Sequence, residues 1–545
     1  MRATHERLVT AYEGRFSDEA APGWAAVRRT DGRWDLALPN KQSLVLDARR
    51  VDDFWNESPA QDPRTTILWR NSLKALLEIH AAEGDWSTAL PALKGFARYL
   101  RAQGPTYDTL RSGSLDHQMA LALRSAATFR SRLNKSTGVT PKLYDEVLAA
   151  LMDVVSEAAT VIKEGTEFRA DNHGVMLTIA CEHAAVIFPE VSSITSLAES
   201  GRESLIPSLR VILDDQGVVR ENTPLYQKLY VSLMRQLADF QEWADVRSDA
   251  TLELRRLTAL AEEALHLMLL PNGHIPPLGD AVGGGSGYGP HPGELYSPGS
   301  GLYIWKDEET FVSAVCGFRG VIHKQADDTS VTLWHAGEHL IRDAGLLSYD
   351  ENDEVAVTLR SQRGHSGFFL ERFDSSSARD LISFGANTSR VTGSLERVTN
   401  GDSEIITMRK LHDGGSPLRR TLELYRQENG MLITDTFEGV PTSSDARVSR
   451  FLFDPSLALT LTGDTLEMRS RTSFVTVAVS GDVTLRFYRG HRSDDAHSLI
   501  GNAALARGLV ATAPYKVSST WAVEYLHTSS EPDAAVTFDV RYGRI

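Results

Sequence analysis

The sequence predicts a multidomain α+β protein in which a helical region precedes a region of strands. The chain has 545 residues, which is too long for a single hydrophobic core. Hydrophobic residues recur at helical spacing up to about residue 270 and alternate from about residue 300 onwards. A glycine-rich stretch at 283–293 separates the two patterns. We therefore expect two large domains of different secondary structure.

Residues 1–61 predict a small N-terminal segment that contains a β-hairpin. Hydrophobic and polar residues alternate on both sides of a turn at Asn40-Lys41, as two short paired strands would require. The alternating hydrophobic residues are Trp34, Leu36, Leu38, Leu44 and Leu46.

Residues 62–278 predict a series of amphipathic helices, each one to two dozen residues long. The clearest helical segments are 90–102, 115–133, 141–162, 175–188, 194–214, 223–244 and 251–270. No heptad pattern is long enough for a coiled coil, and no sequence repeat of fixed length is present. Pairs of helices with short links are compatible with either a stacked solenoid or a closed toroid.

Residues 279–299 predict a connecting loop, and residues 300–545 predict an antiparallel β-sandwich. The loop is rich in glycine but lacks the lysine and hydroxyl residue of a phosphate-binding P-loop. Beyond it, segments such as 457–468 and 475–487 alternate around turns that contain glycine, which is typical of hairpins. Many short alternating strands indicate a large antiparallel sandwich.

The composition is that of an ordinary globular protein, and it restricts the classes of partner. Hydrophobic residues make up 42% of the chain, charged residues 24%, and the net charge is −15. A general basic surface for nucleic acid is therefore not expected, although a few local cations could still hold a polyanion. No apolar run is long enough to span a membrane. The N-terminus lacks the apolar core of a signal peptide, and Cys181 and Cys316 are the only cysteines, so we expect a cytoplasmic protein.

The stretch 168–176 predicts a helix N-terminus beside polar side chains. Asp171 or Asn172 provides an N-cap, and hydrophobic residues follow at helical spacing. His173 then lies in the first turn, where unpaired N–H groups and the helix dipole favour an anion. A capped core helix with one solvated histidine is the alternative interpretation.

Four motifs follow one another along the chain. They are Ser-Leu-Asp-His at 114–117 with Arg124 after it, Asp-Asn-His-Gly at 171–174, Gly-Val-Val-Arg-Glu-Asn-Thr-Pro-Leu-Tyr at 217–226, and Gly-Val-Ile-His-Lys-Gln-Ala-Asp-Asp at 320–328. Asp-Ala-Gly at 343–345 and Arg-Gly-His at 363–365 come next. Together these motifs resemble those of the heparinase II/III-like polysaccharide lyases. The resemblance implies an incomplete α/α toroid at 62–278 joined to the β-sandwich at 300–545.

The resemblance also implies β-elimination on a 4-linked uronic-acid-containing glycan, of the glycosaminoglycan or alginate type. This reaction removes the proton on C5 beside a carboxylate, so preorganised donors must offset the developing charge. Asn172 and His173 match the family's residues for that task. Tyr226 and His323 match the residues that move protons, and which of them is the base stays open. A tyrosine acts as the base only if nearby cations lower its pKa from about 10.

Further residues match the family's substrate contacts and, in several members, a structural zinc site. The substrate-binding candidates are His117, Arg124, Glu221, Asn222, Lys324 and Tyr349. Asp343 and His365 match two zinc ligands, but Gln325 stands where a ligand histidine is found and is a poor zinc ligand beside histidine. Gln325 would either leave the site empty or hydrogen-bond to the other two residues. We therefore expect no required cofactor and no stoichiometric zinc.

The expected partner is an acidic polysaccharide or oligosaccharide, with neither nucleic acid nor a membrane involved, and homo-oligomerisation is left open. Two other function classes also stay open. Glu221 and Asp116 would be the paired carboxylates of a glycoside hydrolase on an α/α toroid. Gln325, together with Gln227 where many family members have histidine, would fit a non-catalytic glycan-binding protein. Tyr226 shares helical spacing with the hydrophobic residues that follow it, so a purely structural tyrosine is the alternative for that residue.

Overall fold

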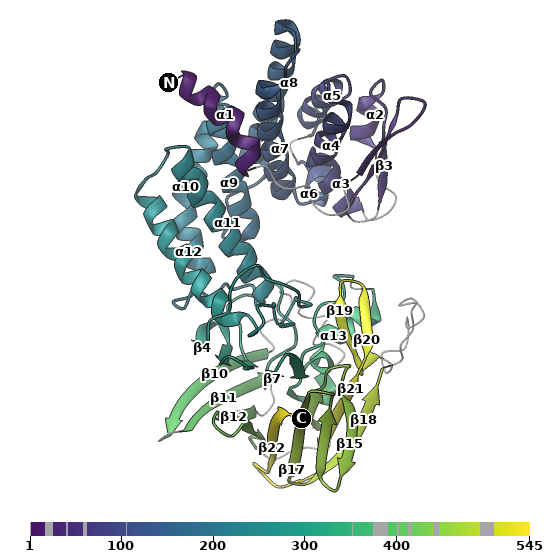
Figure 1. Cartoon of the computed structure of the whole chain (residues 1–545), viewed down its shortest axis with the longest axis vertical. Helices are drawn as coiled ribbons and strands as arrows, with labels where there is room; N and C mark the ends of the chain where they lie inside the picture. The colour runs from purple at the N-terminus through teal and green to yellow at the C-terminus, as the bar shows by residue number, and fades with distance from the viewer. Residues whose placement is uncertain are drawn as a thin grey trace. The chain divides into compact units, whose positions relative to one another are not determined.

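The computed structural model of the chain consists of two compact units (Figure 1). The structure describes residues 2–16, 25–39, 42–57, 63–104, 106–350, 352–373, 391–400, 403–412, 417–439, 446–490 and 506–545. Unit 1 comprises Met1–Ile212 and Ser232–Thr258, and unit 2 comprises Leu213–Val231 and Ala259–Ile545. Two of the helices therefore contribute residues to both units.

Helices dominate unit 1. They are α1 (Arg2–Phe16), α2 (Val51–Asn56), α3 (Pro63–Asn71), α4 (Lys74–Glu83), α5 (Ala89–Arg101), α6 (Asp108–Ser112), α7 (Leu115–Lys135), α8 (Pro141–Gly165), α9 (Asn172–Ile187) and α10 (Ser192–Ile212), with parts of α11 (Pro224–Trp243) and α12 (Asp249–Met268). Helix α7 packs against α1, α8 and α9, and its small apolar residues are buried on nearly all sides. No helix in the described ranges is long and apolar enough to cross a membrane.

The N-terminal segment contains the expected hairpin and three elements that the sequence pattern did not predict, which are α1, β1 and α2. Strands β2 (Trp34–Ala37) and β3 (Ser43–Leu46) pair antiparallel, and β1 (Ala25–Arg28) adds a third strand on β2. The turn predicted at 40–41 lies outside the described residues. Helix α1 was not predicted because its hydrophobic residues are few, yet Tyr12 is fully buried against the other helices.

Unit 2 contains the β-sheets. Its strands are β4 (Gly293–Ser297), β5 (Leu302–Lys306), β6 (Thr310–Val315), β7 (Ser330–His335), β8 (Glu338–Ile341), β9 (Phe368–Leu370), β10 (Val391–Asn400), β11 (Ser403–His412), β12 (Leu418–Tyr425), β13 (Gly430–Phe437), β14 (Arg447–Leu452), β15 (Ala458–Thr462), β16 (Thr465–Arg469), β17 (Ser473–Ser480), β18 (Val483–Arg489), β19 (Leu509–Ala513), β20 (Lys516–Ser519), β21 (Trp521–His527) and β22 (Ala535–Arg544). The short helices are α13 (Glu354–Arg360), η1 (Pro298–Ser300), η2 (Gln362–Gly364) and η3 (Glu371–Phe373).

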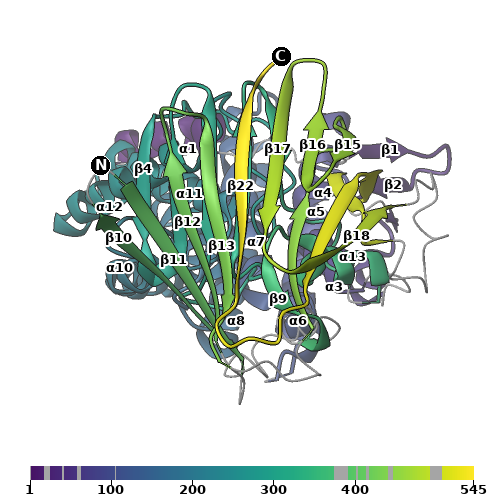
Figure 2. The ribbon, with the colours of Figure 1, turned by 90° about the horizontal axis from the view of Figure 1, so that it is seen from below.

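All the strand pairings of unit 2 among the described residues are antiparallel. One sheet has the order β4-β5-β6-β7-β8, and a longer one has the order β10-β11-β12-β13-β22-β17-β16-β15, which can be followed strand by strand in Figure 2. A further sheet has the order β18-β21-β14-β9. Strand β12 alternates buried and partly exposed residues along its whole length, as one face of a packed sheet requires. Hydrophobic residues of the first two sheets share one core, so this part is a β-sandwich.

The predicted order of helices followed by strands is confirmed. One boundary differs from the prediction, because β4 lies within the stretch expected to be a loop at 279–299 and η1 begins in it. Strand β4 has only five residues and lies among glycine and proline residues, so its alternation of hydrophobic and polar residues is too short to be recognised in the sequence.

Candidate active site

The predicted site residues divide between the two units. Unit 1 holds His117, Arg124, Asn172 and His173. Unit 2 holds Glu221, Asn222, Tyr226, His323, Lys324, Gln325, Asp343, Tyr349 and His365.

The start of α9 presents Asn172 and His173. The N-cap is Asp171, whose Oδ1 accepts a hydrogen bond from the backbone N–H of Gly174 at 3.0 Å. Glycine is required at position 174, because a Cβ there would lie 1.9 Å from the carbonyl oxygen of Arg169. The Arg169 side chain lies beside the His173 ring, with Nη2 at 3.4 Å from Nδ1.

His173 belongs to a charged cluster with Asp116, from the first turn of α7. Nδ1 of His173 lies 3.2 Å from Oδ1 of Asp116, and Arg169 donates to the other carboxylate oxygen at 2.7 Å. Burial alone would raise the pKa of Asp116, but the His173 hydrogen bond and the positive charges of His173 and Arg169 outweigh burial and lower this pKa to about 2. Asp116 is therefore ionised at neutral pH and orients the His173 ring. The ring of His117 is 5.2 Å away from that of His173.

Asn172 and Arg124 differ in their surroundings. The Asn172 side chain is partly exposed and forms no hydrogen bond within the part of the chain that the structure describes. Its amide is therefore available to a ligand. Arg124, by contrast, donates to the backbone carbonyl of Phe16 at 2.9 Å and ties α7 to the end of α1. That contact is structural, and the substrate-binding role expected for Arg124 stays a prediction.

In unit 2, Tyr226 and His323 form a stacked pair. Their ring centroids are 3.8 Å apart and their planes meet at 25°. Tyr226 lies in the first turn of α11, which begins at Pro224, a residue suited to that position. Tyr349 hydrogen-bonds to Tyr226, and its ring lies edge-on to His323 at 6.0 Å. The structure thus brings three of the predicted residues together.

Two carboxylates face the His323 ring. Nδ1 lies 2.9 Å from Oδ2 of Asp280, which is within hydrogen-bond range. Nε2 lies 3.5 Å from Oε2 of Glu221, which is too long for a hydrogen bond but close enough for charge attraction. The other oxygen of Glu221 accepts a hydrogen bond from the hydroxyl of Tyr230. Asp280 was not predicted as a site residue, since it lies in the glycine-rich stretch that was interpreted only as a loop.

Asp280 is held in place through Gly279 and Asn222. Gly279 has φ +55, and a Cβ on it would lie 2.4 Å from the backbone oxygen of Asn222, so the two backbones pack without space for a side chain. Nδ2 of Asn222 donates to the carbonyls of Gly320 at 2.7 Å and Ile322 at 2.9 Å. Asn222, expected to bind substrate, therefore fastens the segment that carries His323.

The environment of Tyr226 raises the pKa of its hydroxyl. Burial is the largest cause, and the negative charges of Glu221 and Asp280 add to it, whereas the hydrogen bond from Tyr349 acts in the opposite direction. A tyrosine that acts as the base would instead need nearby cations that lower this pKa. Lys324, which was expected to bind substrate, does not provide such a cation, because it is buried in a cluster with Asp327 and Asp328 and donates to both.

The burial of Lys324 and Gln227 separates both residues from solvent. Burial would lower the pKa of Lys324, but the two aspartates outweigh burial and raise it, so Lys324 is a charged core residue. Gln227 is fully buried and bonds only to backbone, accepting from Val219 N at 2.9 Å and donating to Gly217 O at 2.8 Å and Ala261 O at 2.7 Å. Because Lys324 is engaged by the two aspartates and Gln227 by backbone groups, neither side chain is placed to contact a substrate directly.

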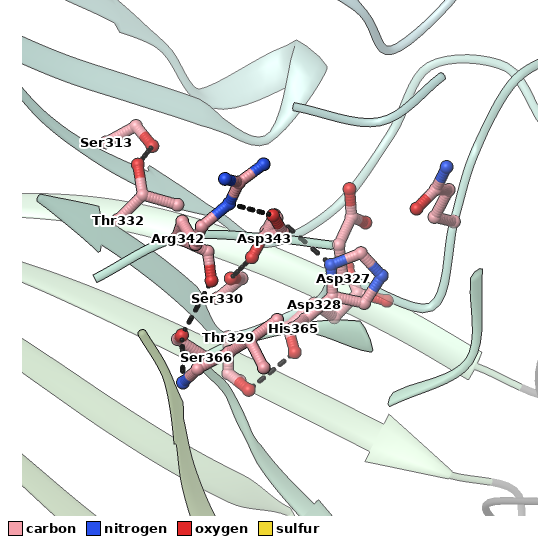
Figure 3. Close-up of polar contacts among 12 residues, drawn as sticks. Ser313, Asp327, Asp328, Thr329, Ser330, Thr332, Arg342, Asp343, His365 and Ser366 are labelled. Atoms are coloured by element: carbon pink, nitrogen blue, oxygen red, sulfur yellow. Dashed lines mark hydrogen bonds and ion pairs between the residues drawn. The ribbon is translucent and has the colours of Figure 1, made fainter. Parts of the chain in front are cut away.

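The predicted zinc ligands lie in the interior of unit 2. Figure 3 shows Asp343 between Ser330 and His365; Ser330 Oγ donates to Asp343 Oδ1 at 2.6 Å, and His365 Nδ1 lies 3.1 Å from Asp343 Oδ2. Gln325 instead uses its amide nitrogen to bind Asp280 at 2.8 Å. In the described ranges no three His, Cys, Asp or Glu side chains are grouped so as to hold a metal. Two strong donors do not make a four-coordinate zinc site, so these residues do not fit structural zinc.

The chain is similar to known proteins in sequence over part of its length and in fold over most of it. A family model described as "Heparinase II/III-like, C-terminal" matches residues 292–513. No curated protein matches the chain by sequence. A solved heparinase III gene product is 13% identical, with 99% of this chain and 88% of that chain covered and a TM-score of 0.67. The heparan sulfate lyase HepC from Pedobacter heparinus is 13% identical, with 92% and 79% covered and a TM-score of 0.65. Another heparinase III structure is 13% identical, with 89% and 79% covered and a TM-score of 0.67.

Similarity at this level of identity is evidence about the fold. The predicted fold class, an incomplete α/α toroid followed by an antiparallel β-sandwich, is confirmed by the likeness to these structures. The resemblance that the four motifs indicated is confirmed as well. The chain thus has the fold of heparinase III, and its residues 292–513 match the model of the heparinase II/III-like C-terminal family.

Proposed function

We propose that this protein is a polysaccharide lyase that cleaves a 4-linked uronic-acid-containing glycan by β-elimination. The observation that supports this most is the stacked pair of Tyr226 and His323, with a carboxylate on each side of the imidazole. A phenol and an imidazole side by side provide one proton donor and one proton acceptor, which is what elimination requires at O4 and C5.

The geometry favours His323 as the base. Its Nδ1 faces Asp280, which sets the tautomer with a proton on Nδ1 and a lone pair on Nε2. Glu221 lies near Nε2 without a hydrogen bond to it, so it would stabilise the positive charge that forms when the ring takes the C5 proton.

Tyr226 is the complementary acid in this proposal. A tyrosine whose pKa is raised keeps its proton at neutral pH, so it is unsuited to removing a proton from C5. It is suited to donating one to the departing O4. Tyr349, hydrogen-bonded to Tyr226, would orient the hydroxyl during that donation.

Asn172 and His173 are assigned to the substrate carboxylate. The charge that develops on C5 deprotonation falls on a group that is already negative, so donors placed in advance are needed. The amide of Asn172 makes no hydrogen bond with the described residues, and His173 is held by Asp116 at the start of a helix, where an anion is favoured.

An acidic glycosaminoglycan is the substrate class that we propose. The structural neighbours are named heparinase III and heparan sulfate lyase, and the N-terminus of α9, where Asn172 and His173 lie, favours an anion although the whole chain has net charge −15. The glycoside hydrolase alternative is disfavoured, because Asp116 with a pKa of about 2 is not the protonated acid that hydrolysis requires. Glu221 is fully buried and bound to Tyr230, which leaves it poorly placed for that role.

Ultraviolet absorbance during incubation with a panel of uronic-acid polysaccharides and oligosaccharides tests the proposal. Elimination creates a C4–C5 double bond conjugated to the carboxylate, which absorbs in the ultraviolet. Hydrolysis produces new reducing ends without that absorbance, and a binding protein produces neither. Reducing ends without absorbance on every acidic glycan would contradict the proposal.

A further inference from the structure

We propose that Gln325 is a positioning residue of the active site, which holds Asp280 in the orientation that fixes His323. This inference rests on the proposed function, because it concerns the imidazole assigned as the base. Gln325 is 1% exposed, and its Nε2 donates to Oδ1 of Asp280 at 2.8 Å. The second oxygen of the same carboxylate faces Nδ1 of His323 at 2.9 Å.

The orientation of the Gln325 amide is set by Asp280 rather than by its own packing. An ionised carboxylate only accepts hydrogen bonds, so the amide nitrogen must face it and the oxygen must face away. Oε1 of Gln325 is buried and has no hydrogen-bond partner among the described residues. An unpaired buried oxygen costs stability, so this arrangement is not one that stability alone would favour.

Asp280 needs a second donor to fix the plane of its carboxylate. The torsion that rotates a carboxylate has broad minima, and one hydrogen bond on one oxygen leaves that rotation loosely defined. Asp280 is fully buried, with His323 and Gln325 on different oxygens. Arg360 lies 3.8 Å from Oδ2, beyond hydrogen-bond range. Gln325 is therefore the one hydrogen-bond donor to Oδ1 among the described residues.

One short segment supplies both donors. His323 adopts φ +59, and the chain turns there, with the N–H of Lys324 bonded to the carbonyl of Val321 at 3.2 Å. This turn brings side chains two positions apart, His323 and Gln325, to the two oxygens of one carboxylate. A shift of the segment therefore moves the imidazole and its orienting carboxylate together.

The experiment replaces Gln325 with methionine, which has a similar length but no N–H donor. We expect kcat on an acidic glycan to fall roughly ten- to hundred-fold with KM changed by less than about twofold, the loss typical of a slightly misplaced catalytic group. Ring ¹⁵N shifts of His323 in histidine-labelled protein, assigned with His323→Gln, should show one dominant tautomer in the parent protein and a mixture in Gln325→Met. Gln325→Asn, which keeps the amide but does not reach Asp280, is the second variant if the first fails to fold.

The matched control is Gln362→Met, the same substitution in the same unit. Gln362 is 2% exposed and accepts from Lys410 Nζ at 2.8 Å, with no contact to Asp280. It should lower the melting temperature without changing kcat or the His323 shifts. If the parent enzyme is active and Gln325→Met has the same kcat and the same His323 shifts as the parent, the inference about Gln325 is overturned and the proposed function is not. An inactive parent protein would instead overturn the proposed function, while the His323 shifts would still test the geometry.

Discussion

The carboxylate of Asp116 lies 3.2 Å from Nδ1 of His173, on a helix 57 residues earlier in the chain. With Arg169 on its other oxygen, this carboxylate has a pKa lowered to about 2 from an ordinary value of 3.8. The ion cluster therefore contributes to the stability of unit 1 and to the orientation of a residue assigned to the substrate.

The first prediction concerns Asp116→Asn. A carboxyl whose pKa is lowered in the folded state stabilises the protein above its unfolded pKa and loses that contribution as the pH falls towards about 2. At pH 7 the substitution should therefore lower the free energy of unfolding by about 2 kcal/mol. The difference between the variant and the parent should shrink between pH 4 and pH 2. Denaturant unfolding at several pH values measures this, with Asp145→Asn on the exposed face of α8 as the control. A difference independent of pH would contradict the assignment.

The second prediction concerns Tyr226→Phe, which keeps the stacked ring and removes only the hydroxyl. If Tyr226 donates the proton to O4, turnover should fall by roughly a hundred- to ten-thousand-fold while the melting temperature stays nearly constant. Initial rates of ultraviolet absorbance on the best substrate measure this. Tyr144→Phe is the control, since its hydroxyl binds Asn134 on a neighbouring helix at 2.8 Å. Full activity in Tyr226→Phe would mean that another group protonates O4.

The third prediction concerns Asn172→Ala. Because the amide makes no hydrogen bond with the described residues, stability should change little. Turnover should fall by an amount typical of losing one preorganised donor, about 2.7–4 kcal/mol in the activation free energy. If Asn172 and Tyr226 act on the same transition state, the double variant should be little worse than the poorer single variant. Fully additive losses would argue that the two residues act in separate steps.

The fourth prediction concerns zinc. Protein purified without added metal should contain well under one zinc per chain, because Asp343 and His365 are only two strong donors and Gln325 is engaged with Asp280. Gln325→His provides a third strong donor and should raise the zinc content measured by elemental analysis. One zinc per parent chain would show that the present ligand set is sufficient.

The fold could be predicted from the sequence where periodicity is strong. The change from helical to alternating spacing predicted the two regions because each pattern reflects which face of an element is buried. Helix α1 and strand β4 were missed for opposite reasons. Helix α1 has few hydrophobic residues and is buried by tertiary packing, whereas β4 lies within a stretch dense in glycine and proline.

The candidate site was predictable only where residues lie in motifs. Tyr226 and His323 were identified in this way, but Asp280 was not, because no spacing rule relates it to a histidine 43 residues later. The core role of Lys324 had a usable signal, since Asp327 and Asp328 follow three and four residues later and both accept from it. The lowered pKa of Asp116 depends on Arg169 and His173, which are distant in sequence, so composition gave no indication of it.

The hydrogen bonds of Asn222 to Gly320 and Ile322 join segments about a hundred residues apart. Closing the loop between these segments costs more chain entropy than forming a local helix, so we expect these contacts to form later in folding than the helices. The Tyr226–His323 pair depends on the same closure, since it joins the same two segments. During refolding from denaturant, helical circular dichroism should therefore return before lyase activity. The interval between the two signals reports the time the chain takes to join these two segments, and a catalytic assay becomes a probe of a late stage of folding.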